Sequence, residues 1–263
     1  MSIRDTLKQR EAQRDAAVNG GNEFPDGVTR YVKMGSFGEV NKDGRTFIVL
    51  ADPDNWFFYF VHEDKTFNGK TTHHFRKHTC LHSPKEANGD IKSFFRPNKD
   101  ACPSCKAGAK RKMYAMIPVY DLEYKEYRVI DTAEFHVNNI IADYDKLEKA
   151  MRKATKQADY SIVGEAVHIK QVDKSFALES GDSTDEQLEE AKAFLGMDYG
   201  YADLANFREE SDIAEILQGA SDEAKLDKAF VATLSTVPKE STEASADTTE
   251  GTSEMPKDDD LPF

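Results

Sequence analysis

Three cysteines and five nearby histidines are the residues of this chain best suited to hold a metal ion. Cys102 and Cys105 form a Cys-x-x-Cys motif, Cys102-Pro103-Ser104-Cys105, and Cys80 precedes it in the chain. The histidines of this region are His62, His73, His74, His78 and His82. Thiolates and imidazoles in tetrahedral number are typical ligands of zinc, and a site closed by four protein ligands is structural. The pattern therefore predicts one structural Zn²⁺.

A redox role is the alternative interpretation of the Cys-x-x-Cys motif. A redox motif opens a helix after an apolar strand, whereas this one follows Arg96-Pro97-Asn98-Lys99-Asp100. The segment between Cys80 and Cys102 has little apolar content, so a metal would supply the folding energy that it lacks. The spacing favours a metal but leaves the fourth ligand open among His62, which ends an apolar strand, and His78 and His82, which flank Cys80.

The residues around these ligands are rich in cations and aromatic rings. Residues 65–112 hold 12 basic residues and only 3 acidic ones. Non-specific binding of a single strand needs cations along the phosphates and flat rings on which bases stack. Because strand geometry turns alternate aromatics inward, about half of the run Phe57-Phe58-Tyr59-Phe60 is expected in the core. The candidate DNA-binding residues are Phe75, Arg76, Phe95, Arg96, Lys110, Arg111, Lys112 and Tyr114.

Charge is divided unevenly along the chain. Residues 1–170 hold 28 basic and 24 acidic residues, a net charge of +4, whereas residues 171–263 hold 7 basic and 24 acidic residues, a net charge of −17. The chain ends in Asp258-Asp259-Asp260-Leu261-Pro262-Phe263. A plain solvated tail is the simpler interpretation, but an apolar tip after an acidic run is suited to docking in an apolar pocket with a basic rim. This ending resembles the acidic tip of bacterial single-stranded DNA-binding proteins, which recruits replication and repair enzymes.

Elements that could position these side chains are mainly strands. Apolar patterns and turn residues predict strands at 31–33, 47–50, 56–61, 71–79, 113–119, 126–130, 162–170 and 175–178. Helical patterns cover 139–155, with further acidic helical pieces at 185–195, 201–207 and 213–217. Short strands with one intervening helix fit a small Greek-key barrel of the OB type, another β-barrel or a small α+β sheet.

Composition sets the expected organisation and compartment. We expect an N-terminal helical arm at 1–22, a DNA-binding core at 23–180 with a zinc subdomain at 62–112, an acidic helical region at 181–237 and a disordered tail at 238–263. The chain has neither a signal peptide nor an apolar run long enough to span a membrane, and its few cysteines suit a reducing compartment. These features predict a cytoplasmic protein.

A family resemblance rests on three of these features taken together. They are the run Trp56-Phe57-Phe58-Tyr59-Phe60-Val61-His62, the single Cys80, and the motif Cys102-Pro103-Ser104-Cys105. Over residues 28–170 the chain resembles the zinc-containing single-stranded DNA-binding (helix-destabilising) proteins of tailed phages. The resemblance implies an OB-type barrel and one structural zinc held by His62, Cys80, Cys102 and Cys105. It also implies a non-enzymatic protein that coats single-stranded DNA in replication, recombination and repair. The acidic tip would recruit a polymerase, helicase, primase or nuclease. The N-terminal helix, with its cations Arg4, Lys8, Arg10 and Arg14, could bridge neighbouring molecules along a strand.

Two other functions fit part of the pattern. A zinc-supported nuclease or primase-type module would need acids near the histidines to hold Mg²⁺, and only Glu63 and Asp64 are close in sequence. A zinc-ribbon adaptor that binds protein would not need interleaved cations and rings. The sequence therefore favours single-stranded DNA binding.

Overall fold

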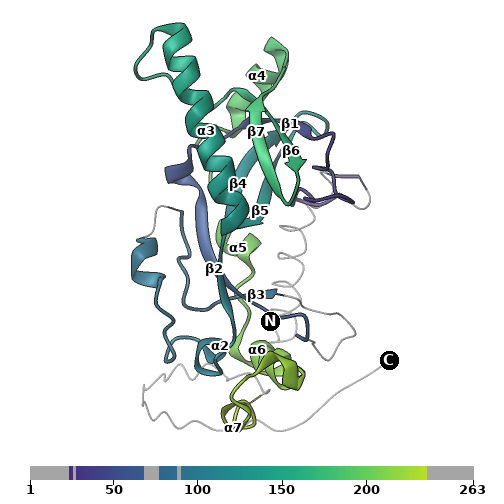
Figure 1. Cartoon of the computed structure of the whole chain (residues 1–263), viewed down its shortest axis with the longest axis vertical. Coiled ribbons are helices and arrows are strands. Elements are labelled where there is room, and N and C mark those ends of the chain that lie inside the picture. The colour runs from purple at the N-terminus through teal and green to yellow at the C-terminus, as the bar shows by residue number, and fades with distance from the viewer. Residues whose placement is uncertain (1–23, 26–27, 68–76, 88–89, 236–263) are drawn as a thin grey trace, which may run out of the picture.

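The computed structural model describes residues 24–25, 28–67, 77–87 and 90–235. It is a mainly antiparallel sheet with a few helices (Figure 1). Within these residues, no helix combines the length and apolar character needed to cross a bilayer. The expected N-terminal arm at 1–22 and the tail at 238–263 lie outside the described residues.

The sheet is built around one long strand. Its strands are β1 (Arg45–Val49), β2 (Phe57–Glu63), β3 (Lys77–Thr79), β4 (Arg111–Asp121), β5 (Glu126–Ala133), β6 (Ala166–Val172) and β7 (Ser175–Ser180). They are ordered β3-β2-β4-β1-β6-β7, and β5 pairs with β4. The first half of β4 pairs with β2 and its second half with β1, while β5 runs along its other edge. Since β6 returns to lie beside β1, the connectivity is non-sequential, as in Greek-key sheets.

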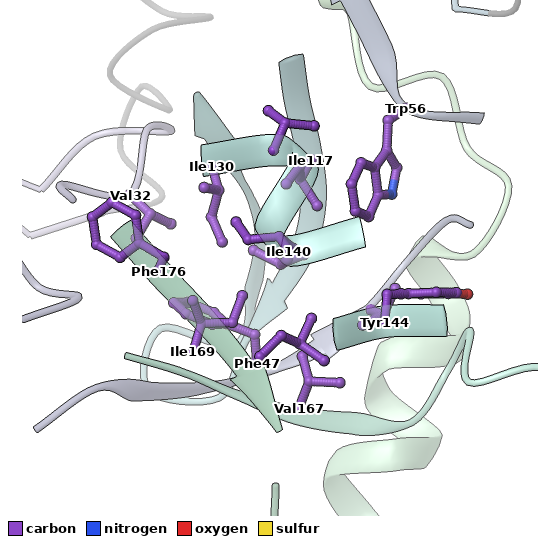
Figure 2. Close-up of a cluster of buried hydrophobic side chains, with 14 of the residues drawn as sticks. Val32, Phe47, Trp56, Ile117, Ile130, Ile140, Tyr144, Val167, Ile169 and Phe176 are labelled. Atoms are coloured by element: carbon purple, nitrogen blue, oxygen red, sulfur yellow. The ribbon is translucent and has the colours of Figure 1, made fainter. Parts of the chain in front are cut away.

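A single long helix covers one face of the sheet. α3 (Glu134–Thr155) buries Val137, Ile140 and Tyr144, which are spaced three and four residues apart and so share one helix face. These side chains meet Phe47 and other strand residues in the core (Figure 2). The other helices are short: η1 (Pro53–Asn55), η2 (Ile91–Phe94), α2 (Pro103–Lys106), α4 (Asp185–Ala191), η3 (Lys192–Phe194), α5 (Tyr201–Ala205), α6 (Glu210–Gln218), η4 (Asp222–Ala224) and α7 (Lys228–Val231).

The segment that follows β7 packs against both ends of the molecule. Tyr201 of α5 stacks on Phe57 of β2, with ring centroids 5.1 Å apart. The hydroxyl of Thr79 donates a hydrogen bond to the carbonyl of Ala205. Further on, α6 and α7 cover the region around α2, where Ile213 and Leu217 pack in one apolar cluster. In Figure 1, α2, α6 and α7 accordingly lie together, at the end of the molecule opposite the upper part of α3.

A buried ion-pair network ties the first described segment to the sheet. Arg128 and Asp121 are fully buried and lie 2.9 Å apart. Arg128 also bonds Glu39 and the backbone carbonyls of Thr29 and Tyr31, while Arg45 reaches Asp121 at 2.6 Å. Charges withdrawn from water are tolerated when they are paired and hydrogen-bonded. Residues 28–40 are therefore held to β5 by polar contacts and by one isolated bridge, between Tyr31 and Val129.

Several expected elements differ from those observed. Residues 31–33, expected to form a strand, make one isolated bridge, between Tyr31 and Val129, and the carbonyl of Tyr31 accepts a hydrogen bond from the Arg128 side chain rather than from a strand. α3 starts at Glu134 rather than at 139, directly after β5, and β6 starts at Ala166 rather than at 162. The expected strand at 71–79 is described only from Lys77. The region 81–112, expected to be an irregular loop, contains η2, α2 and the start of β4.

Candidate metal centre and nucleic-acid interface

The predicted metal ligands are brought together by a hairpin and a short turn. β2 and β3 pair so that His62 lies opposite His78, and the Cys80 N–H donates to the carbonyl of Phe60 at 2.8 Å. Because side chains alternate along a strand, Cys80 faces the same side as His78 and hence as His62. The Cys102–Cys105 turn packs against that face, so all four predicted ligands form one buried cluster.

The spacing of the four ligand atoms fits a tetrahedral ion. The sulfurs of Cys80 and Cys105 are 3.6 Å apart, and the His62 Nε2 lies 3.6 Å from the Cys102 sulfur and 3.5 Å from that of Cys105. A tetrahedral zinc with bonds of about 2.3 Å to sulfur and about 2.0–2.1 Å to nitrogen places its ligands about 3.5–3.8 Å apart. These three distances match that geometry, and all four ligand atoms lie within 4.8 Å of one another. The group could therefore hold a metal ion, and its soft donors are those that zinc prefers.

The Cys-x-x-Cys turn has the local structure that a two-thiolate ligand needs. Pro103 begins α2, where its missing N–H costs nothing. The N–H groups that follow are bonded back to Cys102, Pro103, Ser104 and Cys105, which closes the turn. Gly108 leaves it with a φ of 77°, a conformation that favours glycine. These contacts hold Cys102 and Cys105 on one side of the cluster.

Different hydrogen bonds give the histidines at the site different roles. His62 directs Nε2 at the sulfurs, and its Nδ1 donates toward the carbonyls of Ala109 and Lys110, at 3.3 and 3.2 Å. Such a bond fixes the tautomer that presents Nε2 to a metal. Burial lowers the pKa of His62, but hydrogen bonds with Cys102 and Cys80 and the charge of these two sulfurs outweigh it and raise that pKa to about 9.

His78 and His82 do not belong to the cluster of ligand atoms. The Nε2 of His78 lies 2.8 Å from the hydroxyl of Ser104, and its ring stacks on that of His62. Burial and the neighbouring His62 lower the pKa of His78 to about 3, so its imidazole is neutral. His82 packs against Phe94. Of the three histidines that the spacing left open, His62 is the one placed as a ligand.

Arg111 contacts the same cluster from β4, where it pairs with His62. Its Nε donates to the Cys80 sulfur at 3.4 Å, and its two terminal nitrogens donate to the carbonyls of Phe94, Phe95 and His82. The guanidinium lies 3.6 Å from the centre of the Phe60 ring. The sequence predicted a DNA contact here, whereas four of the five N–H groups of this guanidinium already have protein acceptors.

The predicted DNA-binding residues that the structure describes lie on two sides of β4. Phe95 and Arg96 follow η2, on the side of Arg111, and Phe95 is 54% exposed. Lys112 and Tyr114 point to the opposite face, because side chains alternate along the strand. Lys110 is exposed and immediately precedes β4. Phe75 and Arg76 lie outside the described residues, as do Asp258, Asp259, Asp260, Leu261, Pro262 and Phe263.

Cations on the Tyr114 face are already paired with acids. Lys112 lies 3.0 Å from Glu63, which also accepts a hydrogen bond from the Tyr114 hydroxyl. Lys77 pairs with Asp131 and lies over the Tyr114 ring. Lys77 belongs to the basic stretch 65–112 that the sequence indicated, but it was not among the selected DNA-binding candidates. An anion that binds this face would have to displace the carboxylates of Glu63 and Asp131 from these lysines.

Comparison of the chain with protein-family models, curated proteins and solved structures found no match.

Proposed function

We propose that this chain is a single-stranded DNA-binding protein of the zinc-containing type found in tailed phages. It binds DNA without reading base sequence, holds one structural zinc through His62, Cys80, Cys102 and Cys105, and catalyses no reaction of its own. The observation that carries this proposal is the closed His/Cys₃ cluster at the base of an exposed Phe95-Arg96 pair, within the most basic part of the chain.

The residues that surround the metal centre favour a binding protein over a nuclease or primase-type module. Four protein ligands leave a tetrahedral ion without an open position for water or substrate. Of the two acids near His62, Glu63 faces away and is bonded to Tyr114 and Lys112, and Asp64 accepts from Thr66. Neither carboxylate joins the metal cluster. Among the described residues, the metal centre therefore lacks the paired acids of a phosphoryl-transfer site.

The strand connectivity supports an OB-type barrel as the scaffold. β1 lies between β4 and β6, β4 pairs with β5, and α3 connects β5 to β6. The five barrel strands would be β1, β4, β5, β6 and β7, in that order. In an OB-type Greek key the first of the five strands pairs with the second and the fourth, and the helix follows the third, as here. The barrel would be partly open, because no ladder joins β5 and β7 in the part of the chain described.

The charge of the C-terminal region supports a recruiting role. We propose that the tip Asp258–Phe263 docks on replication and recombination enzymes in the host cytoplasm, with Phe263 in an apolar pocket and the aspartates on a basic rim. The net charge of −17 over residues 171–263 lets the same region compete with DNA for basic residues, an effect that salt screens.

Binding of a fluorescent oligo-dT, measured by anisotropy, tests the proposed function. The full chain should prefer oligo-dT to a duplex of the same length, lose affinity steeply as salt increases, and leave the strand uncut when Mg²⁺ is added. A preference for duplex, or no binding to oligo-dT at low ionic strength, would refute the proposal.

One pair of variants tests the position of the interface. Phe95→Ala should weaken binding by about 1–3 kcal/mol, the usual value of one stacked base. Phe135→Ala is the matched control, since Phe135 is 62% exposed at the start of α3, away from the metal cluster. Equal losses of DNA affinity in the two variants would show that the interface lies elsewhere.

A further inference from the structure

Arg111 is bonded to one of the metal ligands and also to the loop that carries the exposed ring. Its Nε–H points at the Cys80 sulfur, 3.4 Å away, while the other side of the guanidinium donates to the carbonyls of Phe94 at 2.6 Å and of Phe95 at 3.2 Å. A third acceptor, the carbonyl of His82, lies 2.6 Å from Nη2. A single rigid group thus bridges the metal centre and both ends of the segment 82–95.

The two ends of the segment 82–95 are supported differently. Ser83, near the first end, is buried and hydrogen-bonded to the backbone of Phe60. At the other end η2 has no buried residue, although the half-buried Ile91 and Phe94 pack against the cysteine cluster. The end of η2 at Phe95 makes one ring contact with the sheet, an edge-on approach to Phe60 at 6.2 Å. Phe60 is also the ring on which the Arg111 guanidinium lies. The position of Phe95 therefore depends on the same guanidinium through two routes, a carbonyl hydrogen bond and a shared ring.

The charge of the cluster explains why an arginine is placed here. Three thiolates and a neutral imidazole around Zn²⁺ carry a net charge of −1, and the buried site needs a cation close by to offset it. An N–H donated to a thiolate takes up part of that charge. A bound ion would also fix the Cys80 sulfur in place, because it ties that sulfur to His62 and to the Cys102–Cys105 turn. The acceptor of the Arg111 Nε–H would then be held by the metal.

We propose that Arg111 is a positioning residue through which metal occupancy holds the Phe94-Phe95-Arg96 segment in place. The ion fixes the Cys80 sulfur, this sulfur accepts the Nε–H of Arg111 and so orients the guanidinium, and the oriented guanidinium holds the carbonyls of His82, Phe94 and Phe95. Loss of the metal loosens the sulfur, and with it the segment and the ring proposed to stack on DNA. This inference rests on the proposed metal site and deepens its role from structural support to control of the interface.

Three full-length variants separate this role from a general structural one. Arg111→Met removes both the charge and the donors, whereas Arg111→Lys keeps the charge but cannot span the sulfur and three carbonyls. Lys112→Met is the matched control, because this neighbouring cation is exposed and pairs with Glu63. Zinc affinity is measured by competition with a chelator, and the sulfur-to-metal charge-transfer band is recorded with Co²⁺. Amide hydrogen exchange follows Ser93 and Phe95, whose N–H groups are bonded within η2.

The expected results differ among the variants. Arg111→Met should bind zinc about 10–100-fold more weakly, as usual for a lost partner of a ligand, and its Co²⁺ band should shift. Its amides at 93 and 95 should exchange as fast in the zinc-loaded state as in the metal-free state. Arg111→Lys should recover part of the zinc affinity but not the protection, and Lys112→Met should match the wild type in both.

Two results would overturn the inference. One is a zinc-loaded Arg111→Met protein with wild-type affinity and wild-type protection at 93 and 95. The other is a wild-type chain whose protection there is unchanged when a chelator removes the metal, a measurement that needs no variant to fold. Neither readout involves DNA, so a chain that fails to bind oligo-dT refutes the proposed function and leaves this coupling to be judged by exchange alone.

Discussion

Replacing Cys80 should weaken zinc binding much more than replacing Cys102, although both residues supply one thiolate. The sulfur of Cys80 accepts a hydrogen bond from a cation, the Nε–H of Arg111 at 3.4 Å. The Cys102 sulfur instead contacts the other ligands of the cluster.

The difference can be worked out from that bond. A hydrogen bond to a charged group contributes about 1.5–3 kcal/mol. Cys102→Ser removes one thiolate and keeps this bond, whereas Cys80→Ser removes one thiolate and also leaves the Arg111 Nε–H without its acceptor. Zinc affinity should thus be about 10–150-fold lower in Cys80→Ser than in Cys102→Ser.

Competition for zinc between each full-length variant and a chromogenic chelator measures this ratio. The ratio is measured again in an Arg111→Met background, where the two variants should bind zinc about equally, because the bond to Cys80 is absent from both. A ratio that persists in that background, or weaker binding by Cys102→Ser than by Cys80→Ser when Arg111 is present, would refute the reasoning.

Three further predictions concern stability and the tail. Asp121→Ala should destabilise the fold by about 3–5 kcal/mol, because it removes the fully buried acid that Arg128 and Arg45 share. Glu123→Ala, at an exposed partner of the same network, should cost less than about 1 kcal/mol in thermal unfolding, and similar losses in the two variants would contradict this. Burial raises the pKa of Tyr199 to about 12. The stabilising effect of this residue is therefore complete below the unfolded-state pKa near 10 and is lost as pH rises toward 12. Tyr199→Phe should make the melting temperature fall less steeply over that window, and an unchanged slope would show that Tyr199 does not contribute to it. Deleting residues 238–263 should strengthen oligo-dT binding at low salt and abolish capture of partner enzymes, and a truncated chain that keeps both properties unchanged would rule out both roles of the tail.

Residue type and spacing were sufficient to predict the metal centre. Thiolates and imidazoles are rare and chemically distinctive, so Cys80, Cys102 and Cys105 could be selected without knowledge of the fold, and the structure confirms that they form one buried group with a histidine. The central strands and α3 were also predictable, because their apolar periodicity is local. The boundaries were less accurate where polar contacts rather than periodicity hold the chain, as at residues 31–33.

The choice of His62 and the role of Arg111 were decided by the tertiary structure. Strand register places His62 opposite His78, but only hydrogen bonds to the carbonyls of Ala109 and Lys110 turn the first ring toward the sulfurs, while Ser104 takes the second. From the sequence, Arg111 is only one cation in a basic run. Its acceptors, which include the Cys80 sulfur and the Phe95 carbonyl, come from segments that are distant in the chain. Composition selects which groups can bind a metal or a strand, whereas long-range pairing selects which of them face one another.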